Sequence, residues 1–187
     1  MNTTEHIIEA YYRYCKKCFT VNDVKVVGGN NRQIDLLAIN LTEGIYYHVE
    51  TTVTHGLKWK PQYFELVTQK FLGYPKPKSK KLDRYYLPEI KLTYQQYGIP
   101  KISKRIICTW VTEIQVEDLN QELNGLTENK YEDIISTIEL LSLRDQVIPD
   151  LQNAIGTSFY EDEILRTMSL LKQRELQVLN SIKKLAL

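Results

Sequence analysis

The stretch that decides the fold is residues 28–54, which read GGNNRQIDLLAINLTEGIYYHVETTVT. Two strand-forming runs, 34–39 and 45–54, flank the turn residues 42–44, so we expect them to pair as a hairpin. The first run is almost wholly apolar, which is typical of a strand covered on both faces of its sheet. The second run is therefore also predicted to be central, although one of its faces is polar.

That polar face carries the first chemical signal. Side chains alternate along a strand, so one face is shared by Tyr46, His48, Glu50, Thr52 and Thr54. A buried acid needs a partner, because an unpaired carboxylate is costly to bury. Asp35 interrupts the neighbouring apolar run in the same way. Since adjacent strands lie about 4.8 Å apart and no basic side chain separates the two acids, they are predicted to bracket one divalent cation.

Weaker signals place the other elements around this hairpin. Further strands are predicted over residues 19–27, 105–111 and 137–143. Helices are predicted over residues 5–18, 61–72, 117–136, 146–155 and 161–186. This order predicts an α/β fold, with a domain over residues 1–150 and a C-terminal helical extension over residues 151–187.

Composition points to a globular protein. The 187 residues are 43% hydrophobic and 25% charged, which excludes a disordered or fibrous chain. No apolar run is long enough to span a bilayer, and the first residues lack the pattern of a secretory signal. Three cysteines do not make a disulfide framework. We therefore expect a cytoplasmic protein with reduced thiols and no membrane association.

The net charge of +1 hides a segregation of charge along the chain. Residues 74–105 contain nine lysines and arginines against two acids, whereas residues 106–187 contain seven against fourteen. Five tyrosines are interleaved with the bases of residues 74–105. Such a segment suits a polyanion with flat bases, although a solvated loop is the simpler interpretation, and we expect it to form a loop.

Three acids stand in a regular order along the chain. Glu9 lies in the first predicted helix, Asp35 follows a glycine-containing turn, and Glu50 stands in the YHVETT of the next strand. This order resembles that of the PD-(D/E)XK nuclease superfamily. The resemblance covers residues 1–75 and is closest to archaeal Holliday-junction resolvases and restriction-endonuclease-like proteins. It implies a restriction-endonuclease-like mixed β-sheet flanked by helices, and a nuclease that uses Mg²⁺ or Mn²⁺.

The same resemblance implies roles for individual residues. Asp35 and Glu50 would be metal ligands, the backbone carbonyl of Thr51 would complete the inner shell, and Glu9 would hold a water or a second metal. Water would attack a phosphodiester bond of the nucleic acid. Contacts to phosphates are expected from the basic residues Arg32, Lys76, Lys78, Lys80, Lys81 and Arg84.

The lysine of the superfamily's Glu-x-Lys motif is replaced by Thr52. A threonine hydroxyl can position a water but brings no positive charge. Three interpretations stay open. The lysine has moved, with Lys70 as first candidate and Lys25 as second; Thr52 suffices at a reduced rate; or catalysis is lost and the fold binds nucleic acid or a protein partner.

The expected function is a metal-dependent endonuclease in DNA repair, recombination or phage defence, with RNA open as a second substrate. An inactive binding module is the alternative, and an ordinary α/β protein with structural acids is a third. The last predicted helix carries an apolar stripe: Ile164, Met168, Leu171, Val178, Ile182 and Leu185. Such a stripe favours packing on the core, with a homodimer contact as the alternative.

Overall fold

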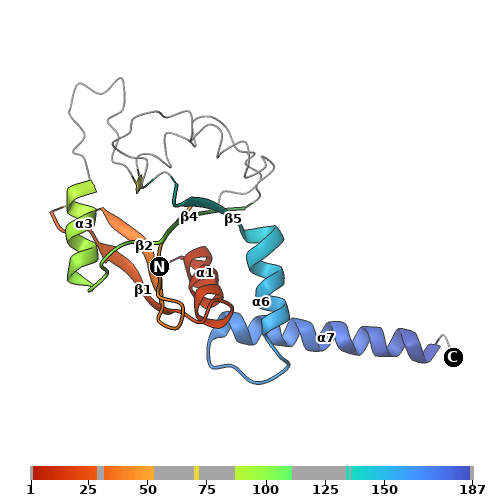
Figure 1. Cartoon of the computed structure of the whole chain (residues 1–187). Coiled ribbons are helices and arrows are strands. Elements are labelled where there is room, and N and C mark those ends of the chain that lie inside the picture. The colour runs from red at the N-terminus through yellow and green to blue at the C-terminus, as the bar shows by residue number, and fades with distance from the viewer. Residues whose placement is uncertain are drawn as a thin grey trace.

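The computed structural model describes residues 2–28, 32–52, 70–71, 87–110, 134 and 136–185. In this part the chain is an α/β fold built on a five-stranded mixed sheet (Figure 1). The strands are β1 (Phe19–Lys25), β2 (Gln33–Asn40), β3 (Ile45–Thr51), β4 (Lys104–Thr109) and β5 (Ile138–Ser142), and they lie in chain order across the sheet. β1, β2 and β3 are antiparallel, whereas β3, β4 and β5 are parallel.

The β2–β3 hairpin forms where the sequence predicts it. The side-chain oxygen of Asn40 accepts hydrogen bonds of 3.0 Å from the backbone N–H groups of Thr42 and Glu43. Gly44 completes the turn with a φ of +66°, a left-handed conformation that suits glycine. The turn sets the register of the two strands, which begins with the pair of Asn40 and Ile45.

β1 departs from regular strand geometry at Asp23. Its φ of +50° lies in the left-handed region, which is uncommon for a residue with a side chain. The ladder pairs the flanking residues, Asn22 and Val24, with β2 but skips Asp23 itself. Asp35 stands opposite Asp23 in this register, so the sheet is distorted beside that acid.

Two helices cover opposite faces of the sheet (Figure 1). α1 (Thr3–Tyr14) packs against the face that carries Ala38 and Val49. α3 (Leu87–Gln96) packs through Ile90 and Tyr94 against the other face, which carries Leu37. Because side chains alternate, the polar positions of β3 belong to the face under α3.

The helix α3 corrects one expectation. Residues 74–105 are predicted to be a loop, but α3 lies within this range. Its apolar residues Ile90 and Tyr94 are one turn apart and are buried on the sheet, and this pattern is concealed by the surrounding charges. The five predicted strands are confirmed. The predicted helices over residues 61–72 and 117–136 lie outside the described residues, apart from residues 70–71 and 134, which are helical, and residue 136, which belongs to a turn.

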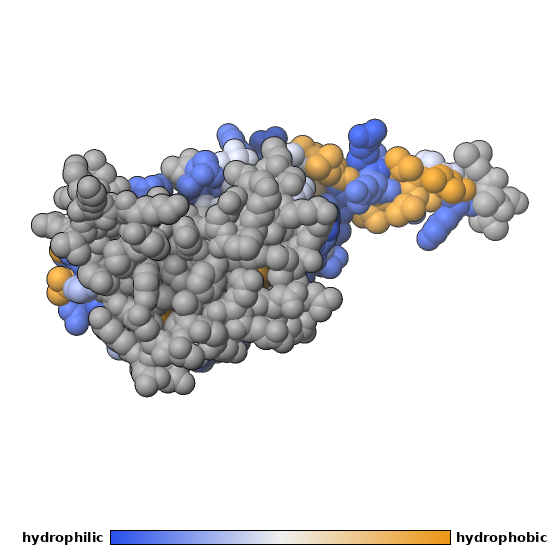
Figure 2. Space-filling model, turned by 90° about the horizontal axis from the view of Figure 1, so that it is seen from above, coloured by the Kyte–Doolittle hydropathy of each residue, from blue (hydrophilic) through white to orange (hydrophobic). Residues whose placement is uncertain are grey.

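The C-terminal part consists of a π-helical turn (Leu143–Val147), α6 (Ile148–Ala154) and α7 (Glu163–Leu185). The predicted boundary between residues 150 and 151 therefore falls inside α6. The first turns of α7 pack on the core, where Leu165 is fully buried. The rest of α7 extends from the body, and Figure 2 shows apolar side chains along it. Leu171, Val178 and Ile182 are exposed, so the expectation that the whole apolar stripe packs on the core is wrong beyond the first turns. A homodimer contact through this helix stays a prediction.

Two further expectations concern the environment of the chain. None of the helices that the structure describes is long and apolar enough to cross a membrane. Cys15, Cys18 and Cys108 are all free thiols, and the last two are buried. The cysteines therefore contribute to packing and form no disulfide framework.

The turn geometry predicts that Asn40→Ala destabilises the chain by about 1–3 kcal/mol. Asn40 is buried, and besides its two turn contacts it donates a 3.0 Å hydrogen bond to the carbonyl of Lys16. Urea unfolding of the variant measures the loss. Asn153→Ala, at an exposed position of α6, is the matched control and should change stability by less than about 0.5 kcal/mol. Equal effects in the two variants would contradict the assigned role of Asn40.

Candidate active site

Two carboxylates meet where the β2–β3 hairpin opens. The last pair of the ladder is Leu36 with Val49, and Asp35 and Glu50 follow it directly. Residues that lie opposite each other in antiparallel strands share a face, so both acids point to the face under α3. The side chain of Glu50 is 4% exposed and that of Asp35 is 12% exposed. Both groups are therefore largely removed from water.

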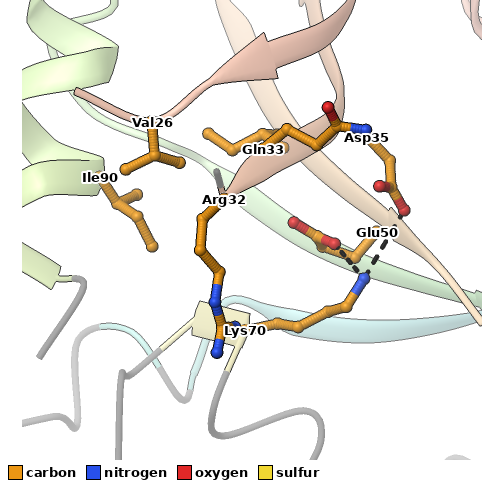
Figure 3. A pocket seen from close by; sticks show the side chains of 8 residues that line it. Val26, Arg32, Gln33, Asp35, Glu50, Lys70 and Ile90 are labelled. Atoms are coloured by element: carbon orange, nitrogen blue, oxygen red, sulfur yellow. Dashed lines mark hydrogen bonds and ion pairs between the residues drawn. The ribbon is translucent and has the colours of Figure 1, made fainter. Parts of the chain in front are cut away.

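A pocket of about 260 Å³ lies over these acids. It is lined by Val26, Arg32, Gln33, Ile34, Asp35, Glu50, Lys70 and Ile90. Figure 3 shows Val26 and Ile90 on one side of the pocket and the two acids with Lys70 on the other. The pocket thus has one apolar wall and one charged wall.

Lys70 makes contact with both carboxylates (Figure 3). Its Nζ forms an ion pair with Oε2 of Glu50 and lies 3.7 Å from Oδ2 of Asp35. Burial alone would lower the pKa of Lys70, but the two carboxylates raise it above its ordinary value, so the ammonium is charged. The sequence pattern of the two strands shows no basic side chain between the acids, but Lys70, the first candidate for a lysine at this site, forms ion pairs with both. Lys70 lies outside the strands, so the pairing of β2 with β3 does not indicate its position.

Thr51 orients Asp35 from the neighbouring strand. Its backbone N–H donates a 2.7 Å hydrogen bond to Oδ2 of Asp35, and its hydroxyl donates a second one of 3.0 Å to the same oxygen. Burial and the charge of Glu50 nevertheless raise the pKa of Asp35, although Lys70 and Thr51 oppose this effect. The charged form of Asp35 is thus incompletely compensated by its neighbours.

Glu50 is compensated more fully. Burial alone would raise its pKa, but His48 and Lys70 hold the pKa below its ordinary value. The imidazole Nε2 of His48 lies 2.9 Å from Oε1 of Glu50, while Lys70 contacts the other oxygen. Each oxygen of this buried carboxylate therefore has its own partner.

The donor set fits a hard divalent cation. The described residues hold no cluster of three or more His, Cys, Asp or Glu side chains arranged around a metal. Mg²⁺, however, is commonly bound by one or two carboxylates, with waters and substrate phosphates completing its shell. A cation beside Asp35 and Glu50 would also relieve the repulsion that raises the pKa of Asp35. The role of the Thr51 carbonyl as a third ligand stays a prediction.

The structure does not bring Glu9 to this site. Glu9 belongs to α1 on the opposite face of the sheet, and it accepts a 2.9 Å hydrogen bond from the hydroxyl of Thr20 on β1. The expectation that it joins the acids is therefore not supported. Lys25 is exposed on β1, with β2 between it and Glu50, so of the two candidate lysines it is Lys70 that contacts the acids.

The remaining predicted residues fall into two groups. Arg32 lines the pocket, and the Thr52 hydroxyl is buried without a hydrogen-bond partner among the described residues. The other predicted phosphate contacts lie outside the described residues: Lys76, Lys78, Lys80, Lys81 and Arg84. The described site therefore contains two acids and two cationic groups around one opening.

No protein-family model matches the chain, and no curated protein or solved structure does so either. Two hard oxygen donors beside an ammonium and a guanidinium suit a divalent cation together with an anionic substrate.

The ion pair predicts a pH-dependent effect of Lys70→Met on stability. At pH 7 we expect the free energy of unfolding of the variant to fall by about 2–3 kcal/mol, because Glu50 keeps its charge but loses this partner. The loss is somewhat smaller than for a fully buried pair. The pKa of Glu50 is lowered in the folded chain, so the stabilisation exists above the ordinary pKa of 4.5 and is lost as the pH falls through the lowered value. Urea unfolding of both proteins between pH 3 and 7 checks this.

The matched control is Lys25→Met, which removes an exposed lysine from β1. Its effect should stay within about 0.5 kcal/mol over the same pH range. A Lys70→Met deficit that persists undiminished at the lowest pH would contradict the ion-pair explanation and point to packing of the lysine stem instead.

Proposed function

We propose that this chain is a metal-dependent nuclease that hydrolyses phosphodiester bonds, with DNA as its substrate. The observation that carries the proposal is the convergence of Asp35, Glu50 and Lys70 on one pocket that Arg32 also lines. The order of one helix, three antiparallel strands and a parallel fourth strand supports a restriction-endonuclease-like fold. Repair, recombination or phage defence are the processes in which such an enzyme would act.

In this proposal Asp35 and Glu50 hold Mg²⁺ or Mn²⁺. The bound cation supplies Lewis acidity that favours attack by water and stabilises negative charge on the phosphate. The protein itself orients both carboxylates beforehand, Asp35 through Thr51 and Glu50 through His48. Preorganised ligands avoid reorganisation when the substrate binds.

Lys70 has the role of the motif lysine, whose position in the sequence is occupied by Thr52. Its ammonium already lies at both acids, so it can donate to a water or to a phosphate oxygen in the same pocket. A fixed positive charge of this kind stabilises the charge that develops in the transition state. The contacts thus favour the first of the three interpretations, in which the lysine has moved.

The cationic groups at the pocket support a polyanionic substrate. Arg32 and Lys70 both line the pocket beside the acids. The helices around the sheet do not repeat the segregation of charge along the sequence, because α3 holds one lysine and one glutamate and α7 holds five basic residues against two acidic ones. The support for a polyanion therefore comes from the two side chains at the site.

An inactive binding module is the second candidate, and one observation favours it. Lys70 satisfies Glu50 without any metal, as a purely structural ion pair would. Such a module would bind DNA with a steep salt dependence but would not turn it over.

Cleavage assays with Mg²⁺ on duplex, junction, flap and single-stranded DNA separate the two candidates. We expect wild type to cleave at least one of these substrates, and Asp35→Asn and Glu50→Gln to lose activity and Mn²⁺ binding together. Lys70→Ala should reduce the rate by about 100-fold or more while the acids still bind Mn²⁺, because it removes a charge from the transition state.

Lys25→Ala is the matched control and should cleave like wild type. Unchanged cleavage by Lys70→Ala would contradict the role of this lysine. Mn²⁺ binding by wild type without cleavage of any substrate would favour the binding module.

Arg32 is predicted to contact a phosphate at the mouth of the pocket. In an Asp35→Asn background, which prevents cleavage, Arg32→Ala should weaken DNA binding and reduce the slope of log K against log salt by about 0.9. Fluorescence anisotropy between 50 and 200 mM salt measures both quantities. Arg13→Ala, at an exposed position of α1 on the opposite face, should leave the slope unchanged. Equal slopes for the two variants would contradict the contact.

A further inference from the structure

Behind Glu50 a line of buried polar groups runs into the body of the protein. The ring of His48 is completely buried between Glu50 and Tyr94 of α3. Its Nε2 lies 2.9 Å from Oε1 of Glu50, and its Nδ1 lies 2.6 Å from the hydroxyl of Tyr94. Phe71 packs edge-on against the imidazole, with ring centroids 4.7 Å apart. The imidazole is thus held in one orientation.

A second cation lies beside the end of this line. Arg105, the partner of His48 on β4, is buried, and its charge acts on both the Tyr94 hydroxyl and the His48 ring. Its Nη1 donates a 2.6 Å hydrogen bond to the hydroxyl of Thr137. The hydrogen-bonded line itself therefore joins three side chains from two elements: Glu50 and His48 of β3 and Tyr94 of α3.

The direction of each hydrogen bond follows from the chemistry of the groups. An ionised carboxylate only accepts, so Nε2 of His48 carries the proton that faces Glu50. With that proton on Nε2, the other ring nitrogen, Nδ1, is left to accept from the hydroxyl of Tyr94, which lies 2.6 Å away. Both ring nitrogens of His48 and Oε1 of Glu50 are satisfied by this one assignment.

We infer that His48 and Tyr94 are positioning residues for the proposed metal site: the line of hydrogen bonds holds Oε1 of Glu50 and presents Oε2 to the pocket. This inference rests on the proposed function. It explains why a polar chain is retained in a buried layer between α3 and the sheet, where apolar side chains would pack as well. Neither residue touches the reacting atoms.

Two substitutions at His48 separate positioning from packing. The amide nitrogen of glutamine can reach the place of the imidazole Nε2, whereas the amide of asparagine reaches only that of Nδ1. We expect His48→Asn to weaken Mn²⁺ binding by about 10- to 100-fold and to lower Mg²⁺-dependent cleavage with it. His48→Gln should restore most of the affinity, because it keeps a donor for Glu50. Calorimetric titration of the full chain measures both.

Tyr94→Phe tests the residue that follows His48 in the line, and Tyr97→Phe is its matched control. The first removes the donor to Nδ1, and we expect a smaller loss of Mn²⁺ affinity than in His48→Asn. The second removes a hydroxyl from a side chain that is 42% exposed, and it should bind Mn²⁺ like wild type.

Two-bond proton–nitrogen spectra of the histidine rings give a readout that needs no metal. The signals of His48 are those missing from His48→Gln. We expect the Nε2–H tautomer in wild type, with the Nδ1 resonance displaced in Tyr94→Phe. Protonation at Nδ1 instead would overturn the inferred direction of the line.

Three further outcomes would overturn the inference. Equal Mn²⁺ affinities in wild type and folded His48→Asn would overturn the positioning role while leaving the metal site intact. Equal losses in His48→Asn and His48→Gln that follow their thermal stability would show a packing role only. A wild type that binds no Mn²⁺ would overturn the proposed function, and the positioning role with it.

Discussion

The need to compensate two carboxylates inside a protein shapes this structure. Asp35 and Glu50 face one side of a central hairpin, where each charge is costly unless other groups stabilise it. The compensation comes from three directions: Lys70 from the helical residues 70–71, Thr51 from the adjoining strand, and His48 from the layer beneath α3. Lys70 joins a segment distant in sequence to the hairpin, and His48 in turn contacts Tyr94, so the interactions that hold the site also tie α3 to the sheet.

Local patterns were sufficient to predict the sheet. Apolar runs, alternation and turn residues are properties of short segments, and the hairpin with its acids follows from them because strand pairing propagates from a turn. The helix α3 was missed for an equally local reason. It lies in a segment rich in lysine and tyrosine, whereas Ile90 and Tyr94 are buried only because the sheet provides a surface for them.

The site was predictable in part. Asp35 and Glu50 stand on paired strands, so the pattern was enough to place them side by side. That Glu9 would face them could not be judged from its helix alone, because an amphipathic helix can cover either face of a sheet, and α1 covers the other one. Lys70 could be ranked above Lys25 as a candidate, but its contact with the acids could not be derived, since its ion pair depends on the path of a whole connecting segment. His48 gave only the signal of sharing a strand face with Glu50.

The irregular backbone at Asp23 has a consequence for solubility. β1 forms one edge of the described sheet, and it exposes Phe19 and Val21 to solvent. A straight apolar edge offers a template on which another chain can add a strand, which is a common route to aggregation. The left-handed φ of Asp23 interrupts that template midway, and the adjoining carboxylate adds charge to it. The distortion next to the acids thus also disfavours intermolecular β-pairing at the β1 edge of the sheet.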